Sequence, residues 1–238
     1  MEKTPAGAEI DDLLTVRDWL RYATSRFTEA GLVFGHGTET ALDEAAFLIL
    51  TALHLPIDQL EPWLEARLTC AERRRLSEIV AARIETRKPA PYLVGAAWIR
   101  GHRFAVDERV IVPRSYIGEL LDGGLSAVVP DPDGVERVLD LCTGSGCLAI
   151  LAALTFPEAV VDAADISAGA LEVATKNVAD YGLGDRVTLH RSDLFSGLQG
   201  ATYDLIISNP PYVTSAAVAA FPPEYAAEPE LAHLGGAD

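Results

Sequence analysis

The chain has few cysteines, few basic residues in its second half and no long apolar run. Three cysteines in 238 residues argue against a disulfide framework, and none of them stands at zinc-ligand spacing. No apolar run approaches the length of a bilayer span, and acidic residues near the N-terminus interrupt any stretch that could resemble a signal peptide. These absences predict a soluble cytoplasmic protein with no membrane contact and no bound metal.

The acidic excess is concentrated in the second half of the chain. The formal net charge is −16; residues 1–110 carry 17 acidic and 14 basic side chains, whereas residues 111–238 carry 18 and 5. A protein that holds DNA or structured RNA through its phosphates needs a basic face. The second half therefore argues against a nucleic-acid partner, and its charge favours a basic protein partner through long-range attraction.

The first half reads as helical, and the second half alternates strands with helices, which predicts an α/β fold. Helices are expected at about 11–30, at about 40–54, and from a capping box at Thr69 and Glu72 to about Arg87. A short hairpin of residues 96–99 and 103–106 leads into the second half. Four buried strands are expected there, at 136–141, 159–164, 186–191 and 203–208.

A glycine-rich turn follows the first of these strands, in the run Asp140-Leu141-Cys142-Thr143-Gly144-Ser145-Gly146. Glycines at 144 and 146 let the backbone approach a ligand closely. The first N–H groups of the helix that follows are expected to be free to meet a negative group. This pattern fits any nucleotide-type cofactor.

Asp165 ends the second strand, at about the spacing at which a Rossmann-type acidic residue meets a ribose hydroxyl. The alternative is that Asp165 only caps the next helix, but Ser167 is the better cap. A nicotinamide-dependent dehydrogenase is disfavoured: the loop lacks the third glycine at its expected place, and although Ala149 can fill that place, the Asn-Pro-Pro-Tyr motif at residues 209–212 would go unexplained.

The motif Asn209-Pro210-Pro211-Tyr212 comes directly after the fourth strand, at the edge where open α/β sheets bind ligands. The two prolines fix the backbone and leave their carbonyls aimed outward. An Asn side-chain oxygen beside a fixed carbonyl makes two acceptors, which suits the two hydrogens of a planar –NH2 group. A tight turn alone would also explain these residues, but the glycine loop and acidic strand end upstream favour a site for an amide or an exocyclic amine.

In this order, the glycine loop, the acidic strand end and the Asn-Pro-Pro-Tyr motif resemble the class I S-adenosylmethionine-dependent methyltransferases. Within that class, the chain is similar to enzymes that methylate the side-chain amide nitrogen of a protein glutamine. Cys142 stands where the loop of the general class has its first glycine. In this departure the chain resembles the branch of the family that modifies ribosomal protein L-three. Further similarity to that branch covers Phe34 to Thr38, Trp98, Gly101-His102, Val106 to Val110, Val112 to Ser115 and Ile117 to Leu120.

The resemblance implies a Rossmann-like class I methyltransferase sheet, preceded by a small helical domain and a β-hairpin. Residues 1–94 would form a substrate-docking domain, 95–112 the hairpin linker and 113–238 an incomplete S-adenosylmethionine-binding domain. The cofactor's methionine part would lie over the glycine loop, its ribose on Asp165, and its adenine near Asp193 and Leu194. The expected cofactor-binding residues are Asp140, Cys142, Thr143, Gly144, Gly146, Asp165, Ile166, Asp193, Leu194 and Asn209.

The resemblance also implies the catalytic residues. The Asn209 side-chain oxygen and the Pro210 carbonyl would accept the two amide hydrogens of glutamine, and Tyr212 would pack against the amide plane. The branch that methylates peptide-chain release factors is the near alternative. More distant alternatives are an adenine-N6 methyltransferase of nucleic acids, which the acidic charge disfavours, and a truncated relative that binds without turning over.

Two features depart from the pattern. Tyr116 stands where the branch is expected to have proline. The chain also ends 26 residues after Tyr212, with only four of the seven strands of a complete sheet, so it looks like a truncated copy. The strand ending at Ser208 would then be an unprotected edge, and we expect a less stable and less active protein than a complete enzyme. A cooperative melt together with normal cofactor affinity would contradict this expectation.

Overall fold

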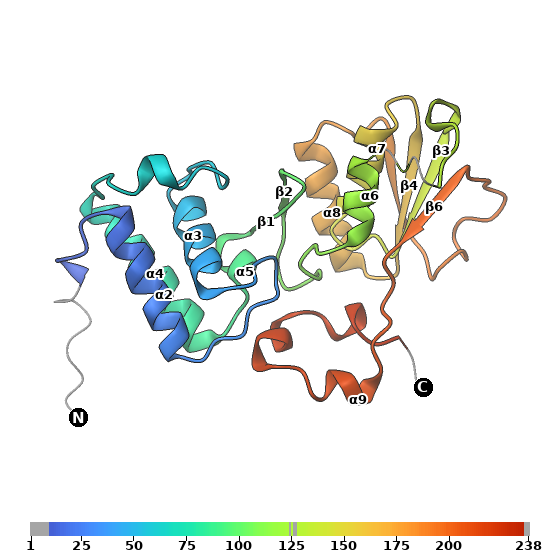
Figure 1. The fold of residues 1–238 in the computed structure, drawn as a ribbon. Coiled ribbons are helices and arrows are strands. Elements are labelled where there is room, and N and C mark those ends of the chain that lie inside the picture. Colours follow the sequence, from blue (N-terminus) through green and yellow to red (C-terminus); the bar gives the residue numbers. More distant parts are fainter. Residues whose placement is uncertain (1–9, 124, 126–127, 236–238) are drawn as a thin grey trace. The chain divides into compact units, whose positions relative to one another are not determined.

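The computed structural model describes residues 10–123, 125 and 128–235, and the chain divides into two compact units (Figure 1). The helical unit consists of the residues up to Val94 together with Pro222–Ala227. The sheet unit takes Gly95–Phe221 and the residues from Glu228 onward. The chain therefore leaves the sheet unit after the Asn-Pro-Pro-Tyr motif, joins the helical unit for six residues and returns.

The helical unit contains the helices α2 to α5 among the described residues, and three of these begin at a threonine cap. The elements are α2 (Val16–Glu29), α3 (Ala41–Ala52), α4 (Cys70–Thr86), α5 (Ala90–Val94) and 3-10 turns at Glu61–Trp63 and Pro223–Ala227. The side chains of Thr15, Thr40 and Thr69 each accept the N–H three residues on. The capping box predicted at Thr69 and Glu72 is confirmed. The core between the helices contains the fully buried Trp19, Phe27, Leu48, Ile49 and Leu76.

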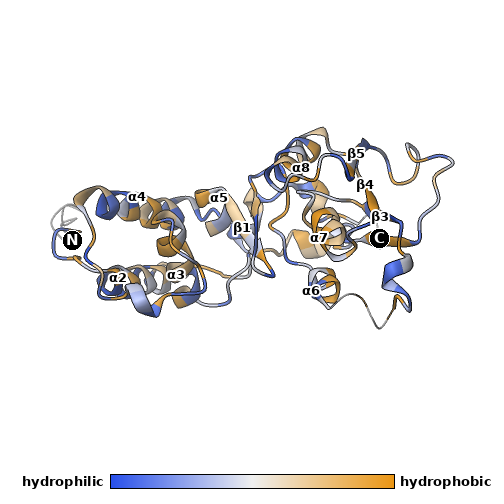
Figure 2. Ribbon diagram, turned by 90° about the horizontal axis from the view of Figure 1, so that it is seen from above, coloured by the Kyte–Doolittle hydropathy of each residue, from blue (hydrophilic) through white to orange (hydrophobic). Residues whose placement is uncertain are grey.

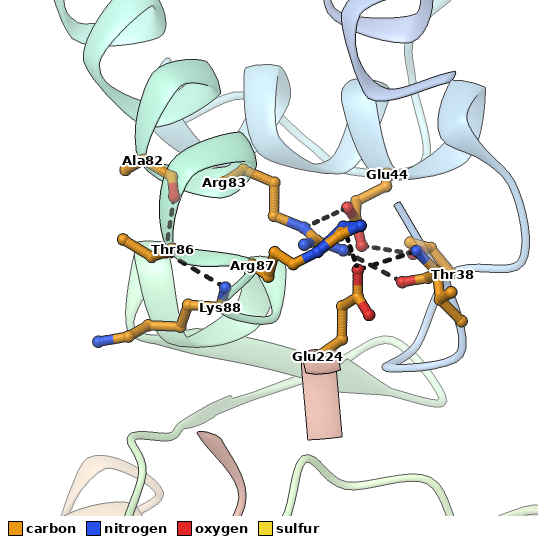
Figure 3. A network of polar contacts seen from close by, with 9 residues as sticks. Thr38, Glu44, Ala82, Arg83, Thr86, Arg87, Lys88 and Glu224 are labelled. Carbon is orange, nitrogen blue, oxygen red and sulfur yellow. Dashed lines mark hydrogen bonds and ion pairs between the residues drawn. The ribbon is translucent and has the colours of Figure 1, made fainter. Parts of the chain in front are cut away.

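A polar network lies inside the helical unit (Figure 3). The Arg83 Nε donates to Glu44 Oε1 at 2.7 Å, and both side chains are fully buried. Burial raises the pKa of Glu44, although the Arg83 guanidinium opposes this. Glu224, from the six-residue return segment, is also buried; its Oε1 accepts the Val33 N–H at 3.0 Å and an Arg87 N–H at 3.2 Å. The segment Pro222–Ala227 is therefore held in the helical unit by a buried carboxylate and not by apolar contacts alone.

The sheet unit contains the predicted hairpin and the four predicted parallel strands, each within two residues of its expected bounds. The hairpin pairs β1 (Ala96–Ile99) with β2 (His102–Ala105), and the parallel sheet has the order β5-β4-β3-β6. Its strands are β3 (Arg137–Leu141), β4 (Val160–Asp165), β5 (Val187–Arg191) and β6 (Leu205–Ser208). The helices are α6 (Tyr116–Asp122), α7 (Cys147–Thr155), α8 (Ala168–Asp180) and α9 (Ser215–Val218), with 3-10 turns at Pro132–Gly134 and Glu230–Ala232.

The main core of the sheet unit lies between α7 and the sheet. Helix α7 is apolar almost all round (Figure 2), because it packs against β3, β4 and the neighbouring helices α6 and α8. Tyr116, at the position where proline was expected, opens α6 after Ser115, whose side chain accepts the Ile117 N–H. In the described part of the chain, β6 is hydrogen-bonded to a strand on one side only, and its Ile206 is half exposed. No helix within the described residues is long and apolar enough to cross a membrane.

Candidate functional site

A cavity of about 440 Å³ opens at the carboxyl ends of the parallel strands. This is the edge at which open α/β sheets bind ligands. The volume falls within the range of roughly 300–1,000 Å³ that is typical of cofactor and small-molecule sites. The structure brings many of the predicted site residues together here; those that line the cavity are Cys142, Gly144, Asp165, Ile166, Asp193, Leu194, Asn209 and Pro210.

The loop between β3 and α7 turns through three residues in the left-handed region. Cys142, Gly144 and Gly146 have φ values of 62°, 56° and 79°. Cys142 thus adopts a left-handed backbone conformation that favours glycine, at some cost in strain. A Cβ on Gly146 would meet the Ala174 Cβ of α8 at 3.1 Å, so this glycine also lets the loop pack closely against α8. The loop is therefore shaped by left-handed residues and by close packing against α8.

Asp140 and Thr143 hold the loop from behind and do not line the cavity. The Asp140 Oδ2 accepts the Thr143 hydroxyl at 2.5 Å and the Ala149 N–H at 3.0 Å. Complete burial raises the pKa of Asp140 to about 7, against the lowering effect of these two hydrogen bonds. The expectation that the first N–H groups of α7 are open to a ligand is wrong at Ala149, because Asp140 already binds that N–H.

Asp165 connects the end of β4 to the glycine loop. Its Oδ2 accepts the Gly144 N–H at 2.9 Å, and its Oδ1 accepts the Ser167 N–H at 2.9 Å. Ser167 is the cap of α8, as predicted, since its hydroxyl oxygen accepts the Ala170 N–H. A carboxylate has about four lone-pair sites, so Asp165 keeps acceptor capacity toward the cavity that it lines.

The motif Asn209-Pro210-Pro211-Tyr212 leaves β6 along the wall of the cavity. The Ser208 hydroxyl donates to the Leu141 carbonyl at 2.7 Å, which ties the end of β6 to the end of β3. Asn209, Pro210 and Pro211 line the cavity, whereas Tyr212 lies outside the lining and its side chain is 77% exposed. The two acceptors expected to bind an amide therefore share one cavity with Asp165 and the glycine loop.

Several lining residues were not among the predicted site residues, and two groups of them lie away from the predicted strand ends and their loops. The first is Arg109 to Ile111, part of which falls in the segment Val106 to Val110 that carried the family resemblance. The Arg109 side chain is ion-paired with Asp107 and Glu172 at 2.7 and 2.6 Å. The second group lies in residues 229–235, which carry no periodic pattern that could have indicated a site. No cluster of three metal-ligating side chains occurs in the described part of the chain.

The parallel sheet, its glycine loop and the Asn-Pro-Pro-Tyr motif after β6 define a class I methyltransferase. A family model described as the Methyltransferase small domain matches residues 122–221. Proteins named "Ribosomal protein uL3 glutamine methyltransferase" match almost the whole chain. The one from Bordetella pertussis is 58% identical over 227 residues, covering 95% of this chain and 76% of that protein. The one from Bradyrhizobium diazoefficiens is 58% identical over 233 residues, covering 95% and 73%.

The chain belongs to the family of the ribosomal protein uL3 glutamine methyltransferases. This confirms the branch indicated by Cys142 and by the segments around it, since L-three and uL3 denote the same ribosomal protein. A third relative of the same name, from Neisseria gonorrhoeae, is 54% identical and covers 95% of this chain and 76% of its own length.

Proposed function

We propose that this chain methylates the side-chain amide nitrogen of a glutamine in ribosomal protein uL3, with S-adenosylmethionine as methyl donor, in the cytoplasm. The observation that carries the proposal is that Asn209 and Pro210 share one cavity with Asp165 and the glycine loop. The names of the relatives support the substrate.

The residues present fit S-adenosylmethionine. The cavity has the volume of a cofactor site, and it offers a carboxylate at Asp165 for ribose hydroxyls and a glycine-shaped loop for close approach. Ile166, Asp193 and Leu194 would border the adenine. Asp140, Thr143 and Gly146 would act from behind the lining, by holding the loop. When bound, the cofactor supplies an electrophilic methyl group on a sulfonium.

Asn209 and Pro210 would orient the amide group of the substrate glutamine. An amide nitrogen is a weak nucleophile because its lone pair is shared with the carbonyl. When the Asn209 oxygen and the Pro210 carbonyl accept both amide hydrogens, the nitrogen is fixed with its lone pair facing the cavity. Orientation of this kind can recover roughly 7–11 kcal/mol of a barrier in favourable cases. Tyr212, which is exposed in this structure, would cover the bound amide and exclude water.

The test of the function is peptide mapping by mass spectrometry after incubation with S-adenosylmethionine and a mixture of free uL3 and release factor. One added methyl group on one glutamine of uL3 is expected. Methylation of release factor alone would place the substrate in the other branch, and no methylation of either protein would contradict the proposal.

Asn209→Ala should abolish methyl transfer and leave cofactor binding largely intact. The unfolding midpoint should stay close to that of the unchanged protein, because Asn209 makes no structural hydrogen bond that the described residues reveal. The chain offers a contrasting control in Asn177→Ala. Asn177 is buried, and its amide binds Ala105 and Ser145 backbone groups at 2.7 to 3.0 Å. Its removal should lower the unfolding midpoint. Equal loss of stability in both variants would mean that Asn209 has a structural role instead.

A further inference from the structure

The chain returns to the cavity after its excursion through the helical unit. Residues Glu228–Gly235 run beside the Asn-Pro-Pro-Tyr motif, and Pro229, Leu231, Ala232 and Gly235 line the same cavity. We call residues 228–235 the return strand, although they form a 3-10 turn at Glu230–Ala232 and a single β-bridge at Leu234. Its hydrogen bonds to the residue that follows the motif are made by backbone atoms.

Backbone hydrogen bonds join the return strand to the residue that follows the motif. The Val213 N–H donates to the His233 carbonyl at 2.9 Å, and the Gly235 N–H donates to the Val213 carbonyl at 3.0 Å. Together they form a parallel bridge between Val213 and Leu234. Because Val213 is bonded through both its N–H and its carbonyl, the position of the motif backbone is linked to the position of the return strand.

Gly235 fits closely against the motif. A Cβ at this position would lie 2.8 Å from the Tyr212 Cα, 3.1 Å from the Pro211 carbonyl oxygen and 3.1 Å from the Tyr212 carbonyl carbon. All three neighbours are backbone atoms, so no side chain can turn away to make room. Any side chain at 235 must therefore displace either the return strand or the backbone of Pro211 and Tyr212.

An ion pair between the partly exposed Arg114 and the buried Glu228 fixes the other end of the return strand. The carboxylate of Glu228 is fully buried and accepts two hydrogen bonds from the Arg114 guanidinium, both at 2.7 Å. It also accepts the Val112 N–H at 3.0 Å. This two-point geometry sets direction as well as distance. The return strand is thus anchored at Glu228 and touches the catalytic motif at Gly235.

We propose that the return strand is a clamp that sets the position of the Asn209-Pro210-Pro211-Tyr212 backbone for methyl transfer, with Glu228 and Gly235 as positioning residues. The proposal rests on the proposed function. An amide nitrogen reacts only when its lone pair is aligned, and the Pro210 carbonyl is one of the two acceptors that align it. A small displacement of this backbone therefore lowers the rate of transfer without removing any group that touches the cofactor.

The first variant is Gly235→Ala, and its matched control is Gly184→Ala. Gly184 is exposed, its φ is not in the left-handed region, and a Cβ there would meet nothing within 4 Å. Gly235→Ala should lower kcat for methylation of uL3 by about 10- to 100-fold, and this loss should exceed any change in the Kd for S-adenosylmethionine, although Gly235 lines the same cavity. Gly184→Ala should change neither. A fall in kcat that exceeds the change in Kd indicates that the motif is positioned less well, whereas a general loss of structure would weaken cofactor binding to a similar degree.

The second variant, Glu228→Gln, keeps the shape of the side chain and removes its charge. Its control is Glu158→Gln, which removes an exposed carboxylate in the same unit. Hydrogen exchange, read by mass spectrometry on the peptide spanning 209–216, provides a measurement that needs no substrate. Both Gly235→Ala and Glu228→Gln should accelerate exchange of the Val213 amide, whereas the controls should not.

Unchanged exchange in both variants would overturn the clamp, whatever their activity. Faster exchange with unchanged kcat would show that the return strand holds the motif but does not position it for transfer, and would also overturn the proposal. If the unchanged protein methylates neither uL3 nor release factor, the proposed function fails, and the exchange measurement still decides whether the return strand holds the motif.

Discussion

Replacing Asp140 by asparagine should remove a pH dependence from the free energy of unfolding. Asp140 is completely buried, and burial raises the pKa of its carboxyl from 3.8 to about 7. One unit of pKa corresponds to about 1.36 kcal/mol. The difference in the pKa of Asp140 between the folded and the unfolded chain therefore contributes about 4 kcal/mol to the free energy of unfolding at low pH. Within the described residues the Asp140 Oδ1 has no hydrogen-bond partner, which is consistent with a carboxyl that holds its proton.

The sign follows from the order of the two pKa values. The pKa in the folded protein lies above that in the unfolded chain, so the folded state holds the proton over a range in which the unfolded chain has released it. The contribution of Asp140 to stability is therefore fully present below about pH 3.8 and is lost as the pH rises through about 7. The free energy of unfolding should fall with rising pH, relative to a variant that cannot ionise.

The assay is urea unfolding of the unchanged protein and of Asp140→Asn between pH 5.5 and 8, a range that avoids acidic solutions in which this strongly acidic chain approaches zero net charge. The stability difference between the two proteins should change by about 2 kcal/mol across that range. The asparagine oxygen can still accept from Thr143 and Ala149, so only the pH-dependent part is diagnostic. Asp185→Asn, at an exposed position, is the matched control. A difference that stays constant with pH would refute the reasoning.

Two further predictions concern the helical unit and the charge of the protein. Arg83→Met should lower the free energy of unfolding by about 3–5 kcal/mol, because it leaves Glu44 buried without its partner. Replacing Glu44 by leucine in the same variant should restore most of the loss, and urea unfolding of the unchanged protein, Arg83→Met and the double variant measures both effects. Free uL3 should be methylated faster than uL3 in assembled large subunits, and the kcat/KM on free uL3 should fall as salt is added, since residues 111–238 carry 18 acidic and 5 basic side chains. A faster reaction on assembled subunits would contradict this.

Local patterns predicted the elements that place the site. The strands are short apolar runs, the caps at Thr69 and Ser167 are readable from single residues, and parallel strands meet ligands at their carboxyl ends. The place of the loop between a strand and a helix was predicted in the same way, but the left-handed conformation of Cys142 is a finding of the structure, because a side chain there gives no sign of it.

The contacts of residues 222–235 could not be predicted from the sequence. Glu224 pairs with Arg87 over 137 positions, and Glu228 with Arg114 over 114 positions. Each of these glutamates looks like a solvated residue in a segment rich in proline and alanine, because no periodicity marks a buried face there. Burial of a charged side chain depends on a partner that only the folded chain supplies. For the same reason, no local pattern indicated that Gly235 lies against Tyr212.

The helical unit is discontinuous in the sequence, because Pro222–Ala227 belongs to it and Glu224 satisfies the Val33 N–H and Arg87 inside it. An exchange of this unit with that of a relative therefore cannot be made at a single junction near Val94. A chimaera would have to take residues 222–227 from the parent that supplies the rest of the helical unit. Otherwise Arg87 of one parent would have to pair with the segment 222–227 of the other. Chimaeras that exchange the chain up to Val94 together with residues 222–227 should therefore fold better than chimaeras that exchange only one of these two parts.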